Sequence, residues 1–400
     1  MNRYLQQCHE IASRESRNII GLMSGTSVDG LDIALCRISG AGMDTRIQLR
    51  EFTTIPYQPA FKAAIANVFS KKMVDLQQLC LLNGWIAEQH AALILQALSD
   101  WNIPTSEIDL IASHGQTIFH APKSLHQLPD FGNGTLQLGD GDHLAVRTGI
   151  LTLSDFRQKH IAGGGEGAPL AAYGDYLIFS KKGENRIMLN IGGIANFTFL
   201  PGDLNPDHVF CTDTGTGNTL MDAFIQQVYP GTYYDADATV ALQGSINEQL
   251  LAALLDHPFF SQGFPKTTGP ELFNLAYLSA AQQRSGTTSI SDFDTMATLN
   301  RFSAEGIARA INTQVKELDQ YHFYVSGGGM HNPLLMKNLL ALLPGVQFKP
   351  TTVLQINPDA KEAVLFAVLA NEWLTGGRVQ YGEGRNGIPT VSMGKLSFPG

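Results

Sequence analysis

The order of expected strands and helices is repeated along this 400-residue chain, and the repeat constrains its fold more than any other feature. In each half, closely spaced apolar strands are followed by helices and a further strand. In the first half the strands are expected at 19–23, 31–38, 46–55, 108–113 and 150–155, and the helices at 59–101, 142–148 and 169–180. In the second half the strands are expected at 186–191, 194–200, 208–212 and 321–326, and the helices at 238–256, 296–318, 332–342 and 361–374. Two such α/β halves predict two domains with a ligand-binding cleft between them.

A turn of small residues, Ser24-Gly25-Thr26-Ser27, separates the first two expected strands. Such a turn exposes backbone N–H groups and hydroxyls that an anionic phosphate can approach closely. Two carboxylates, Asp29 and Asp32, flank the turn and are oxygen ligands of the kind that Mg²⁺ prefers. The alternative is an ordinary hairpin, because Asp29-Gly30 between alternating apolar residues is by itself a strong hairpin signal.

Two further glycine turns lie at strand ends in the second half of the chain. Gly192-Gly193 follows the first strand of this half, at the place that matches the Ser24–Ser27 turn. Gly327-Gly328-Gly329 follows a later strand and precedes a helix, so that a flat ring can lie against bare backbone. Each glycine pair alone indicates only a tight hairpin or a helix N-terminus. Together they favour a nucleotide bound by both halves.

Asp213 follows the third expected strand of the second half, within Asp213-Thr214-Gly215-Thr216-Gly217-Asn218. A carboxylate on a glycine-rich loop at a strand end is well placed to act as a general base. The structural alternative is an Asx-turn or a helix N-cap.

Four other polar residues have a functional and a structural interpretation. His114 and Gln116 follow a strand and either bind a hydroxyl-rich ligand or form a polar turn in which His114 caps a backbone carbonyl. Arg157 follows another strand and either clamps a ligand carboxylate or forms a surface ion pair. Glu362 lies on an otherwise apolar helix, where it is either a surface residue or an inward carboxylate that needs a cation or a water.

Composition excludes several classes of protein. The net charge of −9 and the sequence pI near 5.6 argue against a nucleic-acid partner. No apolar run approaches the ~18 residues of a membrane span, and the first seventeen residues do not resemble a signal peptide. The four cysteines form no C-x-x-C pair. We expect a cytoplasmic protein without a membrane or nucleic-acid partner; a homodimer is left open.

The ordered motifs closely resemble those of the 1,6-anhydro-N-acetylmuramic acid kinases of bacterial cell-wall recycling. The resemblance runs from about Ile19 to Ser397. The motifs of the first half are Met23-Ser24-Gly25-Thr26-Ser27-x-Asp29-Gly30-x-Asp32, Ser113-His114-Gly115-Gln116-Thr117, Asp155-Phe156-Arg157 and Gly164-Gly165-x-Gly167-Ala168-Pro169-Leu170. Those of the second half are Asn190-Ile191-Gly192-Gly193, Asp213-Thr214-Gly215-x-Gly217-Asn218, Lys266-Thr267-Thr268-Gly269 and Gly327-Gly328-Gly329 with Asn332-Pro333-Leu334.

The resemblance implies the fold of the sugar kinase, heat-shock chaperone and actin superfamily. This is an α/β fold of duplicated ribonuclease-H-like domains, βββαβαβα in each half, with the nucleotide in the cleft between them. The first domain would comprise residues 1–157 and 376–400, and the second residues 158–375.

The resemblance also implies a reaction. Water attacks the anomeric carbon, the 1,6-anhydro bridge opens, and O6 takes the γ-phosphoryl group of ATP, which gives N-acetylmuramic acid 6-phosphate and ADP. Asp213 would activate the water with help from Glu362, while His114, Gln116 and Arg157 would orient the sugar. ATP with Mg²⁺ would be bound by Gly25, Thr26, Ser27, Val28, Asp29, Gly30, Leu31, Asp32, Gly192, Gly193, Gly327 and Gly328, and the metal by Asp29 and Asp32.

Three positions depart from the family pattern, which often has Asp, Gln and Arg where this chain has His160, Glu166 and Pro270. Two rival functions use the same glycine turns. One is an actin- or chaperone-like nucleotide switch, which would not need Asp213; chaperones of this superfamily carry a large peptide-binding region that is not present here. The other is a kinase for a different sugar.

Overall fold

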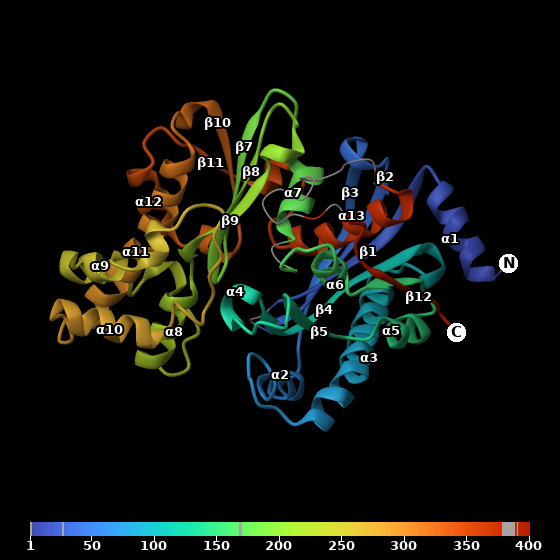
Figure 1. Cartoon of the computed structure of the whole chain (residues 1–400), viewed down its shortest axis with the longest axis horizontal. Helices are drawn as coiled ribbons and strands as arrows, with labels where there is room; N and C mark the ends of the chain where they lie inside the picture. The colour runs from blue at the N-terminus through green and yellow to red at the C-terminus, as the bar shows by residue number, and fades with distance from the viewer. Residues whose placement is uncertain (1, 26–27, 168–169, 378–388, 390) are drawn as a thin grey trace. The chain divides into compact units, whose positions relative to one another are not determined.

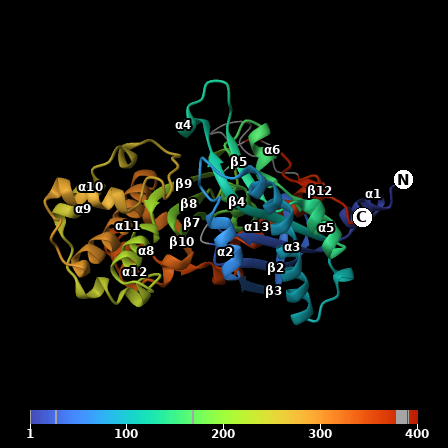
Figure 2. The ribbon, with the colours of Figure 1, turned by 90° about the horizontal axis from the view of Figure 1, so that it is seen from below.

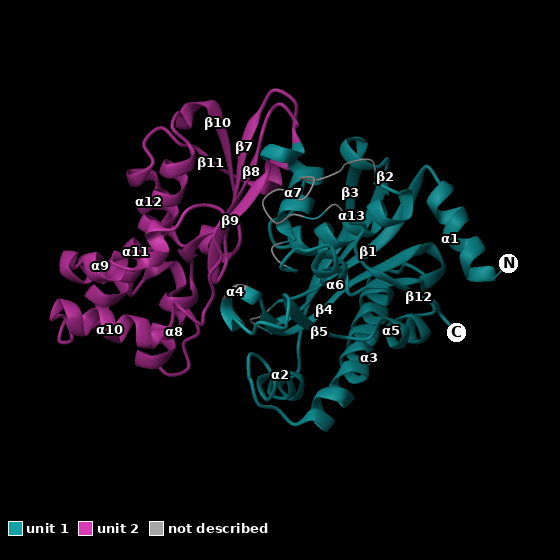
Figure 3. Cartoon of the chain, viewed as in Figure 1, with its two compact units in different colours: residues 1–180, 206–208, 355–400 teal, residues 181–205, 209–354 magenta. Residues whose placement is uncertain are grey.

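The computed structural model describes residues 2–25, 28–167, 170–377, 389 and 391–400 (Figure 1). The chain forms two compact units, whose segments are coloured in Figure 3. Unit 1 consists of residues 1–180, 206–208 and 355–400, and unit 2 of residues 181–205 and 209–354. The boundary between them follows residue 180, whereas the sequence predicts a division after residue 157. The helix at 361–375 belongs to unit 1, because it packs on the first sheet.

The sheet of unit 1 has the strand order β12-β6-β4-β1-β2-β3, and β5 pairs with β4. The first three strands form an antiparallel meander: β1 (Ser16–Ser24), β2 (Gly30–Ser39) and β3 (Arg46–Pro56). Figure 2 shows β2 and β3 side by side. The other strands are β4 (Leu110–Ala121), parallel to β1, β6 (Thr152–Ser154), parallel to β4, and the antiparallel β5 (Gly134–Leu138) and β12 (Lys395–Ser397).

Alternation along β1 explains how helices cover both faces of this sheet. Ile20 and Leu22 pack in a core with buried residues of α3, whereas Gly21 between them faces α13. A Cβ at Gly21 would overlap the carbonyl oxygen of Ala363, so α13 approaches the strand at backbone distance. The helices of this unit are α1 (Arg3–Ser13), α2 (Pro59–Ala66), α3 (Leu76–Asp100), α4 (Lys123–His126), α5 (Gly141–Thr148), α6 (Phe156–Ala162), α7 (Ala171–Phe179) and α13 (Lys361–Thr375).

The two ends of the chain lie side by side in unit 1 (Figure 2). The ring of Tyr4 stacks on Phe398 with 5.4 Å between centroids, and Arg3 donates a hydrogen bond of 2.9 Å to the carbonyl of Gly400. Helix α1 contacts α13. Residues 2–17, which precede all of the family motifs, are therefore a folded part of unit 1.

The sheet of unit 2 has the strand order β11-β10-β7-β8-β9. It repeats the order β6-β4-β1-β2-β3 of unit 1, with an antiparallel meander followed by two parallel strands. Its strands are β7 (Asn185–Ile191), β8 (Ile194–Leu200), β9 (Phe210–Thr216), β10 (Tyr321–Ser326) and β11 (Phe348–Pro350). This repeat confirms the predicted duplicated, ribonuclease-H-like α/β fold.

The helices of unit 2 share one apolar core with its sheet. They are α8 (Thr219–Val228), α9 (Glu248–Leu255), α10 (Leu275–Ser285), α11 (Asp292–Gln314) and α12 (Pro333–Leu342). Side chains of Asn247, Asn274, Ser291 and Asn332 accept hydrogen bonds from the first turns of four of them and so fix where these helices begin.

Several predicted boundaries were wrong. Strand β4 continues past Ser113 to Ala121 and pairs with β5, where the sequence predicts a loop. Strand β9 begins at Phe210 and runs past Asp213 to Thr216, which the prediction ended at 212. The helix predicted at 238–256 is α-helical only from Glu248, because short 3₁₀ turns precede it. Among the helices of the described residues, none combines the length and the apolar character of a membrane span.

Candidate active site

The first glycine turn joins β1 to β2 in unit 1. The N–H of Val28 donates to the carbonyl of Gly25 (3.2 Å), and Val28 has a left-handed backbone with φ +55°. The predicted residues Thr26 and Ser27 lie outside the described residues. Asp29 is exposed, and Leu31 is buried in the core. At Gly30 a Cβ would lie 2.6 Å from the carbonyl oxygen of Ile55, so this glycine allows β3 to pair closely.

A buried chain of hydrogen bonds holds the start of this turn. Gln116 accepts from the Ser24 hydroxyl (2.5 Å) and donates to the carbonyl of Gly25 (3.2 Å). Ser24 also bonds the hydroxyl of Tyr57 (2.7 Å), which bonds Nε2 of His90 on α3 (2.8 Å). Gln116 is fully buried, and its amide nitrogen also donates to Thr117. In this structure Gln116 therefore supports the glycine turn, rather than offering its amide protons to a ligand.

Tyr57 and His90 were missed by the sequence interpretation. The one available signal was position 90, four residues after Ile86 and four before Ile94 on the apolar face of α3. A histidine on such a face is buried and needs a hydrogen-bond partner. Burial lowers the pKa of His90 to about 4, so it is neutral at physiological pH.

His114 and Arg157 contact each other. Strand β4 has a bulge at His114-Gly115, where Gly115 adopts φ +74°. Arg157 donates from Nε to Nε2 of His114 (2.9 Å) and from its NH1 nitrogen to the carbonyl of Gly167 (2.7 Å). His114 Nδ1 lies 2.9 Å from the carbonyl of Gly115, which bears out the predicted carbonyl cap. Burial, followed by the Arg157 charge, holds the pKa of His114 well below its usual range.

His160, one of the departures from the family pattern, fixes the loop that follows α6. Its Nδ1 accepts a hydrogen bond from the N–H of Gly167 (2.9 Å). Its ring meets Tyr173 edge-on, with 5.6 Å between centroids. Gly167 is thus bound by His160 through its N–H and by Arg157 through its carbonyl. An aspartate oxygen, as in the family pattern, is also an acceptor for this N–H.

The charges of three other acidic side chains act on Asp32 of β2. Thr54, its cross-strand partner, donates a hydrogen bond of 2.6 Å to its carboxylate. Desolvation raises the pKa of Asp32 to about 6, against the Thr54 hydrogen bond, and the charges of Glu362, Asp359 and Asp29 raise it further. A cation would relieve this repulsion, so the residues fit Mg²⁺. In the described residues no three metal-binding side chains gather closely enough to hold an ion by themselves. One or two carboxylates with phosphate oxygens are the usual Mg²⁺ environment.

Glu362 lies in the first turn of α13 and has solvent access. Desolvation by the surrounding protein raises its pKa, and the charges of Lys361 and Arg157 oppose this. Neighbouring Lys361 is buried and forms an ion pair of 3.0 Å with Asp175 of α7. This pair, which the sequence did not indicate, ties the first turn of α13 to α7 and so fixes the backbone at Glu362.

In unit 2 the glycine turns meet at one place. The carbonyl of Gly193 accepts hydrogen bonds from Gly217 (2.8 Å) and Thr219 (3.1 Å), at the start of α8, and that of Gly192 accepts from Asn218 (2.9 Å). A Cβ at Gly217 would overlap the carbonyl oxygen of Gly192. The structure therefore brings the Gly192-Gly193 turn against the glycine-rich segment after β9.

The third turn closes on the same hairpin. Gly327 adopts φ +83°, and a Cβ there would lie 2.7 Å from both Asn190 Oδ1 and the carbonyl oxygen of Ile191. A Cβ at Gly328 would lie 3.7 Å from Asn218 Nδ2. Backbone from three segments thus lies close together, with Gly193 and Gly328 exposed, which is an arrangement suited to phosphates or a flat ring.

Asp213 lies within β9, where it pairs with Asn196 next to a bulge at Thr214. The sequence, in contrast, predicts that Asp213 follows the strand. Its Oδ2 accepts a hydrogen bond from the N–H of Thr268 (2.8 Å), and its Oδ1 has no partner within the described ranges. The N-cap of α8 is Asn218, so the N-cap alternative for Asp213 was wrong. Desolvation raises the pKa of Asp213 to about 7, Thr268 opposes this, and Glu271 adds to it. A carboxylate with such a pKa accepts protons readily near neutral pH.

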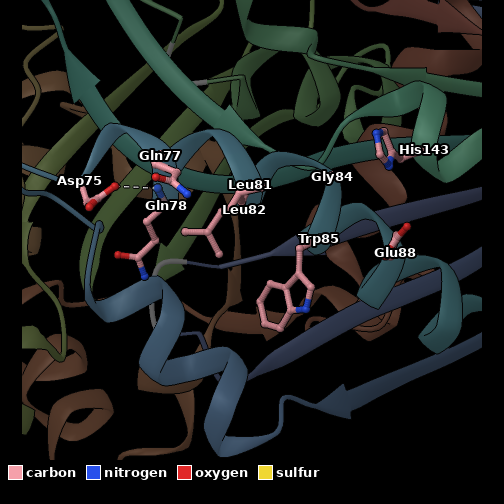
Figure 4. A pocket seen from close by; sticks show the side chains of 9 residues that line it. All are labelled: Asp75, Gln77, Gln78, Leu81, Leu82, Gly84, Trp85, Glu88 and His143. Atoms are coloured by element: carbon pink, nitrogen blue, oxygen red, sulfur yellow. Dashed lines mark hydrogen bonds between the residues drawn. The ribbon is translucent and has the colours of Figure 1, made fainter.

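A separate hollow of about 630 Å³ lies between α3 and α5 (Figure 4). Gly84 of α3 allows the ring of His143 to lie against this helix. None of the predicted site residues lines it; its lining residues are Asp75, Gln77, Gln78, Leu81, Leu82, Gly84, Trp85, Glu88 and His143.

Comparison with known proteins identifies the family. A family model described as anhydro-N-acetylmuramic acid kinase matches residues 17–384. A relative of that name from Pseudoalteromonas atlantica is 56% identical over 400 residues, which are 100% of both chains. Another of that name, from Caldanaerobacter subterraneus, is 35% identical over 393 residues, 97% of this chain and 98% of the relative. The chain therefore belongs to the anhydro-N-acetylmuramic acid kinase family.

Proposed function

We propose that this protein uses ATP to open and phosphorylate 1,6-anhydro-N-acetylmuramic acid. Water adds to the anomeric carbon, the bond from that carbon to the bridging oxygen breaks, and the released O6 attacks the γ-phosphorus of ATP. The products are N-acetylmuramic acid 6-phosphate and ADP, which would serve cell-wall recycling in the cytoplasm. Membership in the kinase family and the environment of Asp213 together support this proposal.

Asp213 is the proposed general base for the water. One of its oxygens is held by the Thr268 N–H, and the other has no partner in the described chain. A carboxylate fixed in this way has a free lone pair for a proton of water. Glu362, with a raised pKa and solvent access, is the second proposed acid–base group.

Each unit has its own proposed substrate contacts. In unit 1 the Gly25–Asp32 turn would bind phosphate, and Arg157 would bind the sugar with the help of His114. In unit 2 Gly192 and Gly193 would approach phosphate, while Gly327 and Gly328 would leave room for the adenosine. Catalysis of phosphoryl transfer rests mainly on such positioning and on neutralising charge. Asp29 and Asp32 would hold Mg²⁺, which when bound neutralises charge on the phosphates.

Transfer of an oxygen isotope tests the reaction. In H₂¹⁸O, brief turnover should place one ¹⁸O on the anomeric carbon of the product and none in its phosphoryl group. Mass spectrometry of product fragments reads the position, and N-acetylmuramic acid incubated without enzyme corrects for exchange. Direct phosphorylation without hydrolysis, or ¹⁸O in the phosphoryl group, would contradict the proposal.

The two rival functions and the oligomeric state need separate measurements. A nucleotide switch would release ADP at the same slow rate with and without the anhydro sugar, whereas the kinase should depend on it. A panel of sugars, read by product mass, distinguishes a kinase for a different sugar. The homodimer left open by the sequence is checked by light scattering.

A further inference from the structure

Lys266 is a buried lysine in unit 2 to which no step of the proposed reaction assigns a role. Only 8% of the residue is exposed. Its Nζ donates a hydrogen bond to the carbonyl of Phe259 (2.8 Å) and lies 4.3 Å from the Phe259 ring centroid. The rings of Phe264 and Phe260 lie 4.7 and 5.9 Å away. The ammonium group is therefore enclosed by aromatic faces.

This lysine has no carboxylate at ion-pair distance in the described part of the chain. Desolvation lowers its pKa, as expected for an ammonium group taken out of water. Burying a charge without a counter-ion is unfavourable, and a methionine would fill the same space without that cost. The ring faces and the Phe259 carbonyl oxygen attract the ammonium group electrostatically, so this site prefers a cation.

The backbone of Lys266 holds the strand segment that carries Asp213. The carbonyl of Lys266 accepts hydrogen bonds from the Asp213 N–H (2.9 Å) and from the Thr212 hydroxyl (3.2 Å). Its N–H donates to the same hydroxyl (3.0 Å). Two residues later, the Thr268 N–H donates to the Asp213 carboxylate (2.8 Å). We call residues 266–268 the clamp segment.

The two sets of contacts are made by one residue. The side chain of Lys266 ties the clamp segment to the 3₁₀ turn Pro258–Ser261, and its main chain ties the same segment to β9. An error of about 1 Å in the place of a catalytic group can cost roughly 10²-fold in rate. The direction of the Asp213 carboxylate depends on this segment, because Thr268 supplies its one hydrogen bond among the described residues.

We propose that Lys266 is a positioning residue for Asp213, and that its caged ammonium group fixes the clamp segment so that Thr268 aims the Asp213 carboxylate. The proposal rests on the proposed function in that Asp213 is the base. Lys266 acts through the clamp segment and not by its charge on Asp213, whose facing charged group is Glu271.

The main test replaces the ammonium group while keeping the volume, in Lys266→Met. We expect kcat to fall about 10- to 100-fold, with the KM for ATP within about 2-fold of wild type. Loss of the Thr268 hydrogen bond should also move the titration of Asp213 to higher pH, because that bond favours the ionised form. The titration is measured by NMR on protein with ¹³C-labelled aspartate carboxyl groups, and the Asp213 signal is the one absent in Asp213→Asn.

A second variant keeps the proposal testable if Lys266→Met does not fold. Thr212→Val has nearly the same shape and removes the hydroxyl that joins β9 to the main chain of Lys266. It should change kcat and the Asp213 titration in the same directions. The matched control is Thr298→Val, which removes a buried hydroxyl that accepts from the Asn247 N–H (2.9 Å) and donates to the Asp294 carbonyl (2.7 Å). The control should lose stability and keep both readouts.

The outcomes separate this inference from the proposed function. A folded Lys266→Met variant with wild-type kcat and an unchanged Asp213 titration would overturn the positioning role, even if Asp213→Asn is inactive. With Lys266→Met unfolded, an unchanged titration and kcat in Thr212→Val would do the same. If Asp213→Asn keeps its turnover, the base assignment fails, while a shifted Asp213 titration in Lys266→Met would still support the positioning of that carboxylate.

Discussion

The guanidinium Nε of Arg157 donates a hydrogen bond of 2.9 Å to Nε2 of His114. Because Nε2 is the acceptor, the ring proton is on Nδ1, where it donates to the Gly115 carbonyl (2.9 Å). Both nitrogens of His114 are therefore engaged within the protein. The second terminal nitrogen of Arg157, in contrast, has no partner in the described parts of the chain and remains available for a ligand oxygen.

Arg157→Lys should raise the KM for the sugar by about tenfold, because roughly one charge-assisted hydrogen bond to the sugar is lost. A lysine has the charge but cannot bond His114, the Gly167 carbonyl and a ligand in one plane. Steady-state kinetics measures the effect, and calorimetry should show unchanged ATP affinity. The control is Arg147→Lys, at an exposed ion pair with Glu88. Equal sugar KM values for wild type and Arg157→Lys would remove Arg157 from the sugar site.

Replacing Tyr57 should loosen the first glycine turn. Tyr57→Phe removes the hydroxyl between Ser24 and His90 and leaves His90 Nε2 without its partner, which costs about 1–3 kcal/mol of folding free energy. Affinity for ATP should fall as well, because Ser24 precedes Gly25. Thermal unfolding and calorimetry measure the two effects. Tyr277→Phe, which loses a hydroxyl bonded to the Leu254 carbonyl in unit 2, is the control and should retain ATP affinity.

His160 should make stability depend on pH below neutrality. Burial, with the Arg157 charge, lowers its pKa to about 4 from 6.5. Between pH 6.5 and 4 the unfolded chain therefore binds one more proton than the folded chain. The folding free energy that neutral His160 contributes is complete above pH 6.5 and is lost as the pH falls toward 4, by up to about 1.4 kcal/mol per pH unit. His160→Asn keeps an acceptor for the Gly167 N–H but does not titrate, so its stability should decline less. Denaturant unfolding from pH 7 to 4 measures this, and parallel curves would refute it.

Turnover should depend on the ionisation of Asp213. Its pKa is raised to about 7, chiefly by desolvation, and a base must be deprotonated to act. As pH falls below about 7, kcat/KM should therefore fall tenfold per unit, and above that pH it should level off. The Thr298→Val control should give the same profile. A value of kcat/KM that stays level from pH 8 down to 5.5 would exclude Asp213 as the titrating base.

Much of the fold could be predicted from local sequence, because strands such as Ile19–Met23 and Ile194–Leu200 combine apolar runs with glycine turns. The glycine turns at Gly192 and Gly327 were predicted from their places at strand ends, whereas the packing of Gly217 against Gly192 was not. The position of Asp213 inside β9 could not be predicted, because the bulge at Thr214 depends on pairing with β8.

Contacts between distant segments were also beyond the reach of the sequence. The roles of Gln116 and Tyr57 depend on hydrogen bonds that join β4, β1 and α3, which no local pattern reveals. The return of α13 to the first sheet, where Gly21 meets Ala363 at backbone distance, is another such contact.

Single-turnover kinetics of Asp213→Asn tests the central claim most directly. Asparagine keeps the size of the side chain and an acceptor for the Thr268 N–H, but its amide is not a base. With saturating anhydro sugar and ATP, the account predicts a rate about 10²- to 10⁴-fold below wild type and unchanged ATP affinity. A folded Asp213→Asn protein that forms the phosphorylated sugar at the wild-type rate would contradict the assignment of Asp213 as the general base.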